Sequence, residues 1–211
     1  MRRVAVLLFN EVEVLDFAGP FEVFTLARTA AEVRARGGLV VKPSHTLGAH
    51  PPIDILIVPG GVVDEPLADP AVIAWIAAQS RTAEITASVC TGAFLTGKAG
   101  LLDGRKATTH WEDLADLRAA LPETTVVDGV PFVDEGRIIS SAGISAGIEM
   151  SLHLVERLHG RRLAELTARQ MQYDRRQQPE LRSSAACLGA ALGLAFEDQS
   201  KLKKSKAGEA Q

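Results

Sequence analysis

The sequence predicts a three-layer α/β/α sandwich built on a mostly parallel β-sheet. Short apolar runs of strand length, such as residues 4–9 and 53–58, alternate with stretches of helical periodicity. The runs are apolar at nearly every position, which is typical of strands buried on both faces of a parallel sheet. Turn residues follow directly on some of them, as in Pro59-Gly60-Gly61. This regular alternation indicates an α/β fold.

The N-terminal segment supplies the first strand and the first helix of this prediction. Residues 4–9 form the strand. Pro20 suits a first helical turn, and the apolar residues among 21–27 give a helix over that stretch its buried face. No second strand is predicted before the apolar run at 39–41, so a strand that such a sheet normally has is missing near residue 31.

The remaining elements continue the alternation. Strands are expected at 53–58, 84–89, 106–110, 124–127, 131–133 and 137–141, and helices at 70–80, 91–98, 111–121, 143–159 and 161–173. After Tyr173 the pattern changes. Residues 1–173 are therefore predicted to form one domain, residues 174–200 a helical extension, and the Lys-rich residues 201–211 a disordered tail.

Charge and cysteine content exclude several classes of protein. The 211 residues carry a formal net charge of −3, with an isoelectric point of about 6.0, which does not favour binding to nucleic acid or to a membrane surface. No apolar run has the length of a membrane span or of a signal-peptide core. The two cysteines, Cys90 and Cys187, do not make a disulfide framework. We expect a cytoplasmic protein with no metal site and no cofactor.

The most informative residue is Cys90, which ends the strand at 84–89. A helix begins directly on its other side, so the cysteine must lie in the turn itself. The free N–H groups and partial positive charge of a helix N-terminus favour a thiolate. Cys90 is therefore either a nucleophile with a lowered pKa or, as many unpaired cysteines are, a small buried apolar residue.

Two further side chains are expected at the same edge of the sheet. Asp16 follows the first strand between Leu15 and Phe17, and it is either a general acid or base or a solvated loop residue. His110 ends the strand at 106–110, and it is either a base near Cys90 or a packed or capping residue. The glycines of Gly143-Ile-Ser-Ala-Gly147 lack the ending of a phosphate-binding loop, which favours close helix–sheet packing.

Five ordered motifs resemble the DJ-1/PfpI (ThiJ) superfamily. They are Leu15-Asp-Phe-Ala-Gly-Pro-Phe-Glu-Val23, Pro59-Gly-Gly61, Ala87-Ser-Val-Cys-Thr-Gly-Ala93, Ala107-Thr-Thr-His-Trp111 and Ser141-Ala-Gly-Ile-Ser-Ala-Gly-Ile-Glu149. The first motif, residues 15–23, resembles the corresponding motif in the branch of the superfamily that holds isonitrile hydratase and the sensor domains of AraC-type regulators. The resemblance covers about residues 3 to 173. It implies a flavodoxin-like sandwich of the class I glutamine amidotransferase type.

The resemblance also implies the roles of the site residues. Cys90 would be the nucleophile on a nucleophile elbow, with Asp16 as the carboxyl group beside it and His110 as an auxiliary. The backbone N–H groups of Gly61 and Thr91 match the oxyanion-hole positions of the superfamily. Members of the superfamily are usually homodimers that act on small molecules.

The resemblance implies a cysteine-dependent hydratase or hydrolase, most like isonitrile hydratase, which converts an isonitrile to an N-substituted formamide. A glyoxalase- or deglycase-like enzyme acting on reactive carbonyls is an alternative. A ligand or redox sensor related to AraC-type regulators is another. Such regulators carry a helix-turn-helix domain, and the segment after Tyr173 lacks a basic recognition-helix pattern, which favours the enzyme.

Overall fold

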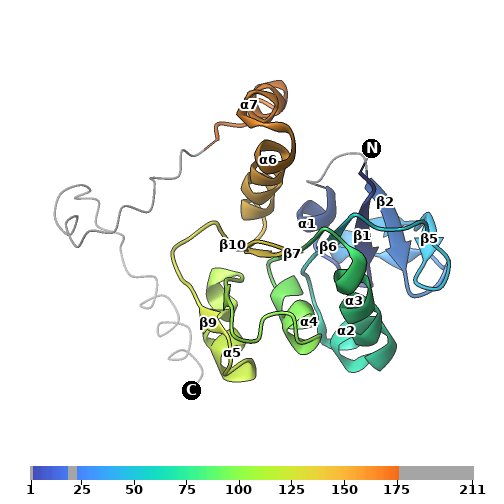
Figure 1. The fold of residues 1–211 in the computed structure, drawn as a ribbon. Helices are drawn as coiled ribbons and strands as arrows, with labels where there is room; N and C mark the ends of the chain where they lie inside the picture. Colours follow the sequence, from blue (N-terminus) through green and yellow to red (C-terminus); the bar gives the residue numbers. More distant parts are fainter. Residues whose placement is uncertain (1, 19–22, 176–211) are drawn as a thin grey trace, which may run out of the picture. The chain divides into compact units, whose positions relative to one another are not determined.

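The structure is a computed structural model that describes residues 2–18 and 23–175 (Figure 1). These residues belong to one unit of the chain. Residues 176–211 lie outside the described residues. They include most of the predicted helical extension at 174–200, with Cys187, and the Lys-rich tail at 201–211, so the structure does not test these predictions. Across the described ranges, no helix is both long and apolar enough to cross a membrane.

A seven-stranded sheet forms the middle layer, in the strand order β10-β11-β7-β6-β1-β2-β5. Every pair of neighbours is parallel except β10 and β11, so the predicted mostly parallel sheet is confirmed. Its strands are β1 (Val4–Leu8), β2 (Val23–Ala27), β5 (His45–Thr46), β6 (Ile55–Val58), β7 (Ile85–Val89), β10 (Phe132–Glu135) and β11 (Ile138–Ser141). Two small ribbons pair β3 (Val33–Arg34) with β4 (Val40–Val41) and β8 (Lys106–Ala107) with β9 (Thr125–Val126).

Helices cover both faces of this sheet (Figure 1). They are α1 (Val14–Ala18), α2 (Asp64–Ala68), α3 (Pro70–Thr82), α4 (Gly92–Lys98), α5 (Leu114–Ala120), α6 (Ala146–His159) and α7 (Arg161–Gln170), with the 3-10 helices η1 (Arg36–Gly38) and η2 (Trp111–Asp113). Residues from α1 and α6 pack on one face, and residues from α3 and α4 pack on the other. Because successive strand residues point to opposite faces, each buried strand contributes to both cores.

The predicted helix over residues 21–27 is wrong for its described part, since Val23–Ala27 form strand β2. All five of its residues pair in parallel with β1, from Val4 with Val23 to Leu8 with Ala27. β-Branched and aromatic residues suit a strand, and the unpaired edge of β1 offers backbone hydrogen bonds that outweigh a weak helical pattern. The second strand predicted to be missing is therefore present, formed from residues that the pattern assigned to a helix.

The carboxyl ends of the strands gather the candidate residues at one edge. From β1 the chain continues to β2 and β5 on one side, and it then returns to β6 on the other side of β1. The strand order therefore reverses between β1 and β6. In open α/β sheets the crevice outside the strands at such a point is where ligands bind. Asp16 follows β1, Gly60 follows β6 and Cys90 follows β7.

Close packing of Gly92 on β6 gives the first prediction. A Cβ at Gly92 would lie 2.2 Å from the backbone oxygen of Val58. Gly92→Ala should therefore lower the free energy of unfolding by about 1–3 kcal/mol, as overpacking does. Urea denaturation followed by circular dichroism measures this. Gly48→Ala is the control, because a Cβ there meets nothing within 4 Å; equal stability of the two variants would contradict the packing.

Candidate active site

Cys90 occupies a sharp turn between β7 and α4. Its φ angle is +54°, a left-handed conformation that a non-glycine residue rarely adopts. The turn is held by two bonds: the Cys90 N–H donates to the Ser141 carbonyl at 3.2 Å, and the Thr109 hydroxyl donates to the Cys90 carbonyl at 2.8 Å. This geometry is that of a nucleophile elbow, in which a strained backbone presents one side chain at the end of a sheet.

The loop after β6 packs directly against this turn because its two glycines have no side chains. A Cβ at Gly60 would lie 2.7 Å from the Thr91 backbone nitrogen and 2.9 Å from the Cβ of Cys90. Gly61 has a φ of +137°, and a Cβ there would lie 2.2 Å from the Glu11 carbonyl oxygen. Both glycines are therefore required for the loops after β1 and β6 to meet at Cys90.

Thr91 joins the same two segments through its hydroxyl. The Thr91 Oγ1 atom donates to the Gly61 carbonyl at 2.8 Å and accepts from the Gly61 N–H at 2.9 Å. The Gly61 N–H, expected to face an oxyanion, therefore has an acceptor within the protein. The Thr91 N–H lowers the pKa of the Cys90 thiol, so of the two it is the donor that acts on the sulfur.

Asp16 is the buried carboxyl group of the site. It is 1% exposed, and its Oδ2 accepts from the Gly60 N–H at 3.0 Å. Its Oδ1 has no hydrogen-bond partner within residues 2–18 and 23–175. Burial raises the pKa of Asp16 to about 7, while the Gly60 N–H opposes this rise, Glu13 adds to it and Arg36 opposes it. A carboxyl group with a pKa near neutrality can both accept and donate a proton.

The thiol of Cys90 is less acidic than the helix start suggests. Burial raises its pKa to about 11, and the negative charge of Asp16 adds to this rise. The N–H groups of Thr91 and Ile144 lower the pKa, but they do not compensate for the lost solvation. The expected low thiol pKa is therefore wrong for the free site: the resting cysteine holds its proton.

Ile144 is a site residue that the sequence did not reveal. It follows β11 with a φ of +53°, which is strained for a β-branched side chain, and its backbone N–H lowers the pKa of the Cys90 thiol. Of the two flanking glycines, Gly147 confirms the predicted close packing of helix on sheet, because a Cβ there would lie 3.0 Å from a methyl group of Val89 on β7. Gly143 packs against the His110 ring instead. No sequence signal marks a β-branched residue in this conformation.

His110 lies beside the site in a capping role. Its Nδ1 accepts from the Glu112 N–H at 3.4 Å, at the start of η2, and lies 3.5 Å from a carboxylate oxygen of Asp113. Its ring packs over Gly143, where a Cβ would lie 2.0 Å from the ring Cδ2. No hydrogen bond connects His110 to Cys90 in the part of the chain that the structure describes. The structure thus brings Asp16, Thr91 and Cys90 together around the loop after β6. The His110 ring lies against Gly143 instead.

A metal ion is not suggested by the donor groups. Among the described residues, no three His, Cys, Asp or Glu side chains are placed to hold one. The groups that the structure places at the site are a thiol, a carboxyl group and backbone N–H donors.

Two kinds of known protein are similar to this chain in sequence. Isonitrile hydratase from Pseudomonas putida is 36% identical over 183 residues, which are 81% of this chain and 78% of that protein. The transcriptional regulator GbdR from Pseudomonas aeruginosa is 34% identical over 151 residues, which are 72% of this chain but 41% of the regulator.

Solved structures share the fold. A ThiJ/PfpI family protein from Pseudomonas syringae superposes with a TM-score of 0.75 at 28% identity, covering 87% of this chain and 79% of that one. A DJ-1 superfamily protein from Salmonella typhimurium gives 0.72 at 28% identity, covering 82% of this chain and 100% of that one. A family profile described as DJ-1/PfpI matches residues 2–157. The chain therefore belongs to the DJ-1/PfpI family.

Proposed function

We propose that this protein is a cysteine-dependent hydratase that acts on a small molecule, most like isonitrile hydratase. The observation that carries the proposal is the pairing of two buried groups, the Cys90 thiol in its strained turn and the Asp16 carboxyl group with an unpartnered oxygen. Similarity to isonitrile hydratase over most of both chains supports the choice of reaction.

The pKa values set the direction of the first proton transfer. Near neutral pH the thiol, with a pKa of about 11, holds its proton, and a large share of Asp16, with a pKa of about 7, is ionised. Asp16 is therefore the base that receives the thiol proton as the sulfur attacks. The N–H groups of Thr91 and Ile144 stabilise the negative charge on the sulfur during this step.

The proposed reaction balances with water as the only other reactant. The sulfur bonds to the terminal carbon of the isonitrile, and that carbon takes the proton held by Asp16, which gives a thioimidate. Ionised Asp16 then removes a proton from water as the water oxygen attacks the same carbon, and Asp16 passes this proton to the nitrogen. The carbon–sulfur bond breaks as the new hydroxyl loses its proton through Asp16 to the sulfur, and an N-substituted formamide leaves. The His110 ring is a candidate to orient the water.

A ligand sensor is the second candidate. Similarity to GbdR over 72% of this chain favours it, and the chain spans about two fifths of that regulator's length. A sensor would bind a small molecule at the same crevice without turnover. A carbonyl-directed enzyme would use the same thiol and carboxyl group, so the substrate assay should include both compound classes.

Replacement of the nucleophile tests the proposal directly. Cys90→Ser should reduce turnover of a good substrate roughly 10³-fold or more, because the weaker hydroxyl nucleophile replaces the thiol. A panel of isonitriles and α-oxoaldehydes, assayed side by side for formamide or hydroxy acid, measures this with the variant as the blank. Unchanged turnover in Cys90→Ser would remove the covalent step; binding of a panel compound without turnover would favour the sensor.

Asp16→Asn separates the two effects of the carboxyl group. Loss of the base should lower turnover about 10²–10⁴-fold. The same substitution removes a negative charge beside the sulfur, so the pKa of the Cys90 thiol should fall. Iodoacetamide alkylation against pH, in a Cys187→Ser background, reports the second effect. A variant that keeps its turnover would move the proton transfer to another group.

The pH dependence of turnover follows from the raised pKa of Asp16. The carboxylate is the required form, so kcat/KM should rise with pH through a midpoint near 7, whereas an ordinary aspartate would give a midpoint near 4. Alkylation of Cys90 should still be increasing above pH 9, since its thiol pKa is about 11. A thiol that titrates below pH 8 would show that the resting site holds a thiolate.

A further inference from the structure

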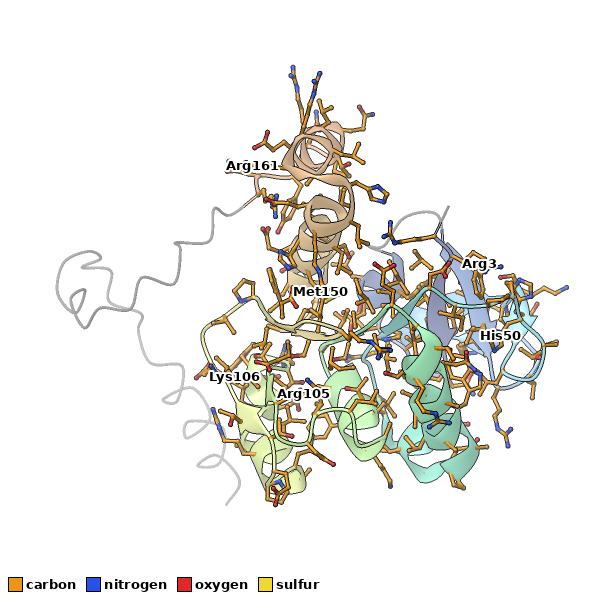
Figure 2. All side chains as sticks on the ribbon, in the orientation of Figure 1. Arg3, His50, Arg105, Lys106, Met150 and Arg161 are labelled. Atoms are coloured by element: carbon orange, nitrogen blue, oxygen red, sulfur yellow. The ribbon has the colours of Figure 1, made fainter. Side chains whose placement is uncertain are left out.

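The segment that leads to His110 lies beside the cysteine turn. It begins at Lys106, which is exposed at the start of β8 (Figure 2), and the next three residues, 107–109, are buried. Thr109 is 0% exposed, and its hydroxyl donates to the Cys90 carbonyl at 2.8 Å. Buried hydroxyl groups need a partner, and a partner in another segment joins the two segments at that point.

The backbone of Cys90 is bonded on both sides to segments that are distant in the sequence. Its N–H donates to the Ser141 carbonyl at 3.2 Å, and its carbonyl accepts from Thr109. These two segments are also bonded to each other, because the Thr108 N–H donates to the hydroxyl oxygen of buried Ser140 at 2.9 Å. The cysteine peptide is therefore held between two segments that cannot move independently.

The bond to the carbonyl matters because the turn is strained. Cys90 has a φ of +54°, and such a conformation persists only where the surrounding structure enforces it. The Cys90 carbonyl also accepts from the Ala93 N–H at 3.2 Å, but that bond lies within the start of α4 and moves with the turn. The Thr109 hydroxyl is the contact that fixes this carbonyl against another part of the fold.

The conformation of the turn sets where the sulfur lies relative to Asp16. Both residues contact Gly60: its N–H donates to the Oδ2 of Asp16 at 3.0 Å, and a Cβ at Gly60 would lie 2.9 Å from the Cβ of Cys90. The negative charge of Asp16 raises the pKa of the Cys90 thiol, as expected for neighbouring groups. A turn that relaxes from its left-handed conformation would carry the sulfur away from this contact.

We propose that Thr109 is a positioning residue for Cys90. Its hydroxyl holds the carbonyl of the strained turn and so keeps the sulfur beside Asp16. The expected effect on turnover rests on the proposed hydratase function, in which Asp16 takes the thiol proton. The expected effect on the reactivity of the thiol does not depend on any substrate.

The test measures how strongly Asp16 acts on the thiol with and without the Thr109 hydroxyl. Alkylation of Cys90 by iodoacetamide is followed in full-length protein, in a Cys187→Ser background, at pH 8, which lies above the Asp16 pKa of about 7. Removal of the Asp16 charge in D16N favours the thiolate and should raise the rate about threefold or more. In T109V, which keeps the side-chain shape but lacks the hydroxyl, D16N should raise the rate less than about 1.5-fold.

The comparison is made within pairs of variants for a physical reason. Asp113 in η2 also raises the pKa of the thiol, and η2 follows closely on Thr109. A substitution at Thr109 that moves η2 would therefore change the alkylation rate by itself. This change is common to T109V and D16N/T109V, so it cancels in their ratio and leaves the effect of Asp16.

Two variants serve as matched controls. T109S keeps the hydroxyl and should show the parent response to D16N. T124V loses the same kind of bond, because the Thr124 hydroxyl is buried before β9 and donates to the Leu102 carbonyl at 3.0 Å; it should also show the parent response. Turnover is a second measurement: T109V should lower kcat about tenfold or more and leave KM within about twofold, since the base no longer faces the thiol.

The response to D16N decides the proposal. A full response in T109V overturns it, even with a lowered melting temperature, because that is the result of a purely structural role. The absence of a response in the parent also overturns it, since the sulfur would then not lie beside Asp16. A response that is reduced in T124V as well would reflect a general loss of stability and would overturn it.

Two further results are separable from these. If no compound is turned over but the responses to D16N are as expected, the proposed hydratase function fails and the positioning role of Thr109 is supported. If T109V does not fold, S140A serves instead, because it removes the acceptor of the Thr108 N–H and loosens the same segment. A partly reduced response to D16N in S140A supports the proposal, and a full response overturns it.

Discussion

The candidate site depends on one buried contact, the hydrogen bond from the Gly60 N–H to the Asp16 carboxylate. It forms only because Gly60 and Gly61 let the loop after β6 approach both the loop after β1 and the cysteine turn. Asp16 is thereby buried close to the sulfur, where its negative charge raises the pKa of the Cys90 thiol. The chemistry proposed for the site follows from this enforced proximity.

Burial decides which of the two groups holds the proton at rest. A thiol with a pKa of about 11 is a poor nucleophile near neutral pH and also a poor target for oxidants, since oxidation begins with the thiolate. This favours a thiol that is activated by transfer to Asp16 when substrate is present, and it weighs against a redox sensor that relies on Cys90.

The predictable part of the fold and site is what local sequence controls. The apolar runs predicted β1, β6, β7 and β11, and the turn position of Cys90 and the apolar flanks of Asp16 placed both residues at the correct sheet edge. Strand β2 was not predictable, because the pairing that selects it comes from β1 rather than from its own pattern. The strained Ile144 and the direction of the thiol pKa depend on tertiary packing and burial, which no local pattern encodes.

Burial of Asp16 also lowers the free energy of unfolding at the pH where the carboxylate is needed. The pKa of Asp16 in the folded protein, about 7, lies above its ordinary value of 3.8, so the folded state binds the proton more tightly than the unfolded chain. Stability contributed by this group is therefore full below pH 4 and declines as the pH rises toward 7. Helix α1, only five residues long, must hold the ionised form in place, and the hydrogen bond from the Gly60 N–H offsets part of that cost. A site of this kind retains stability because the surrounding sheet, not the helix that carries the carboxylate, provides most of the packing.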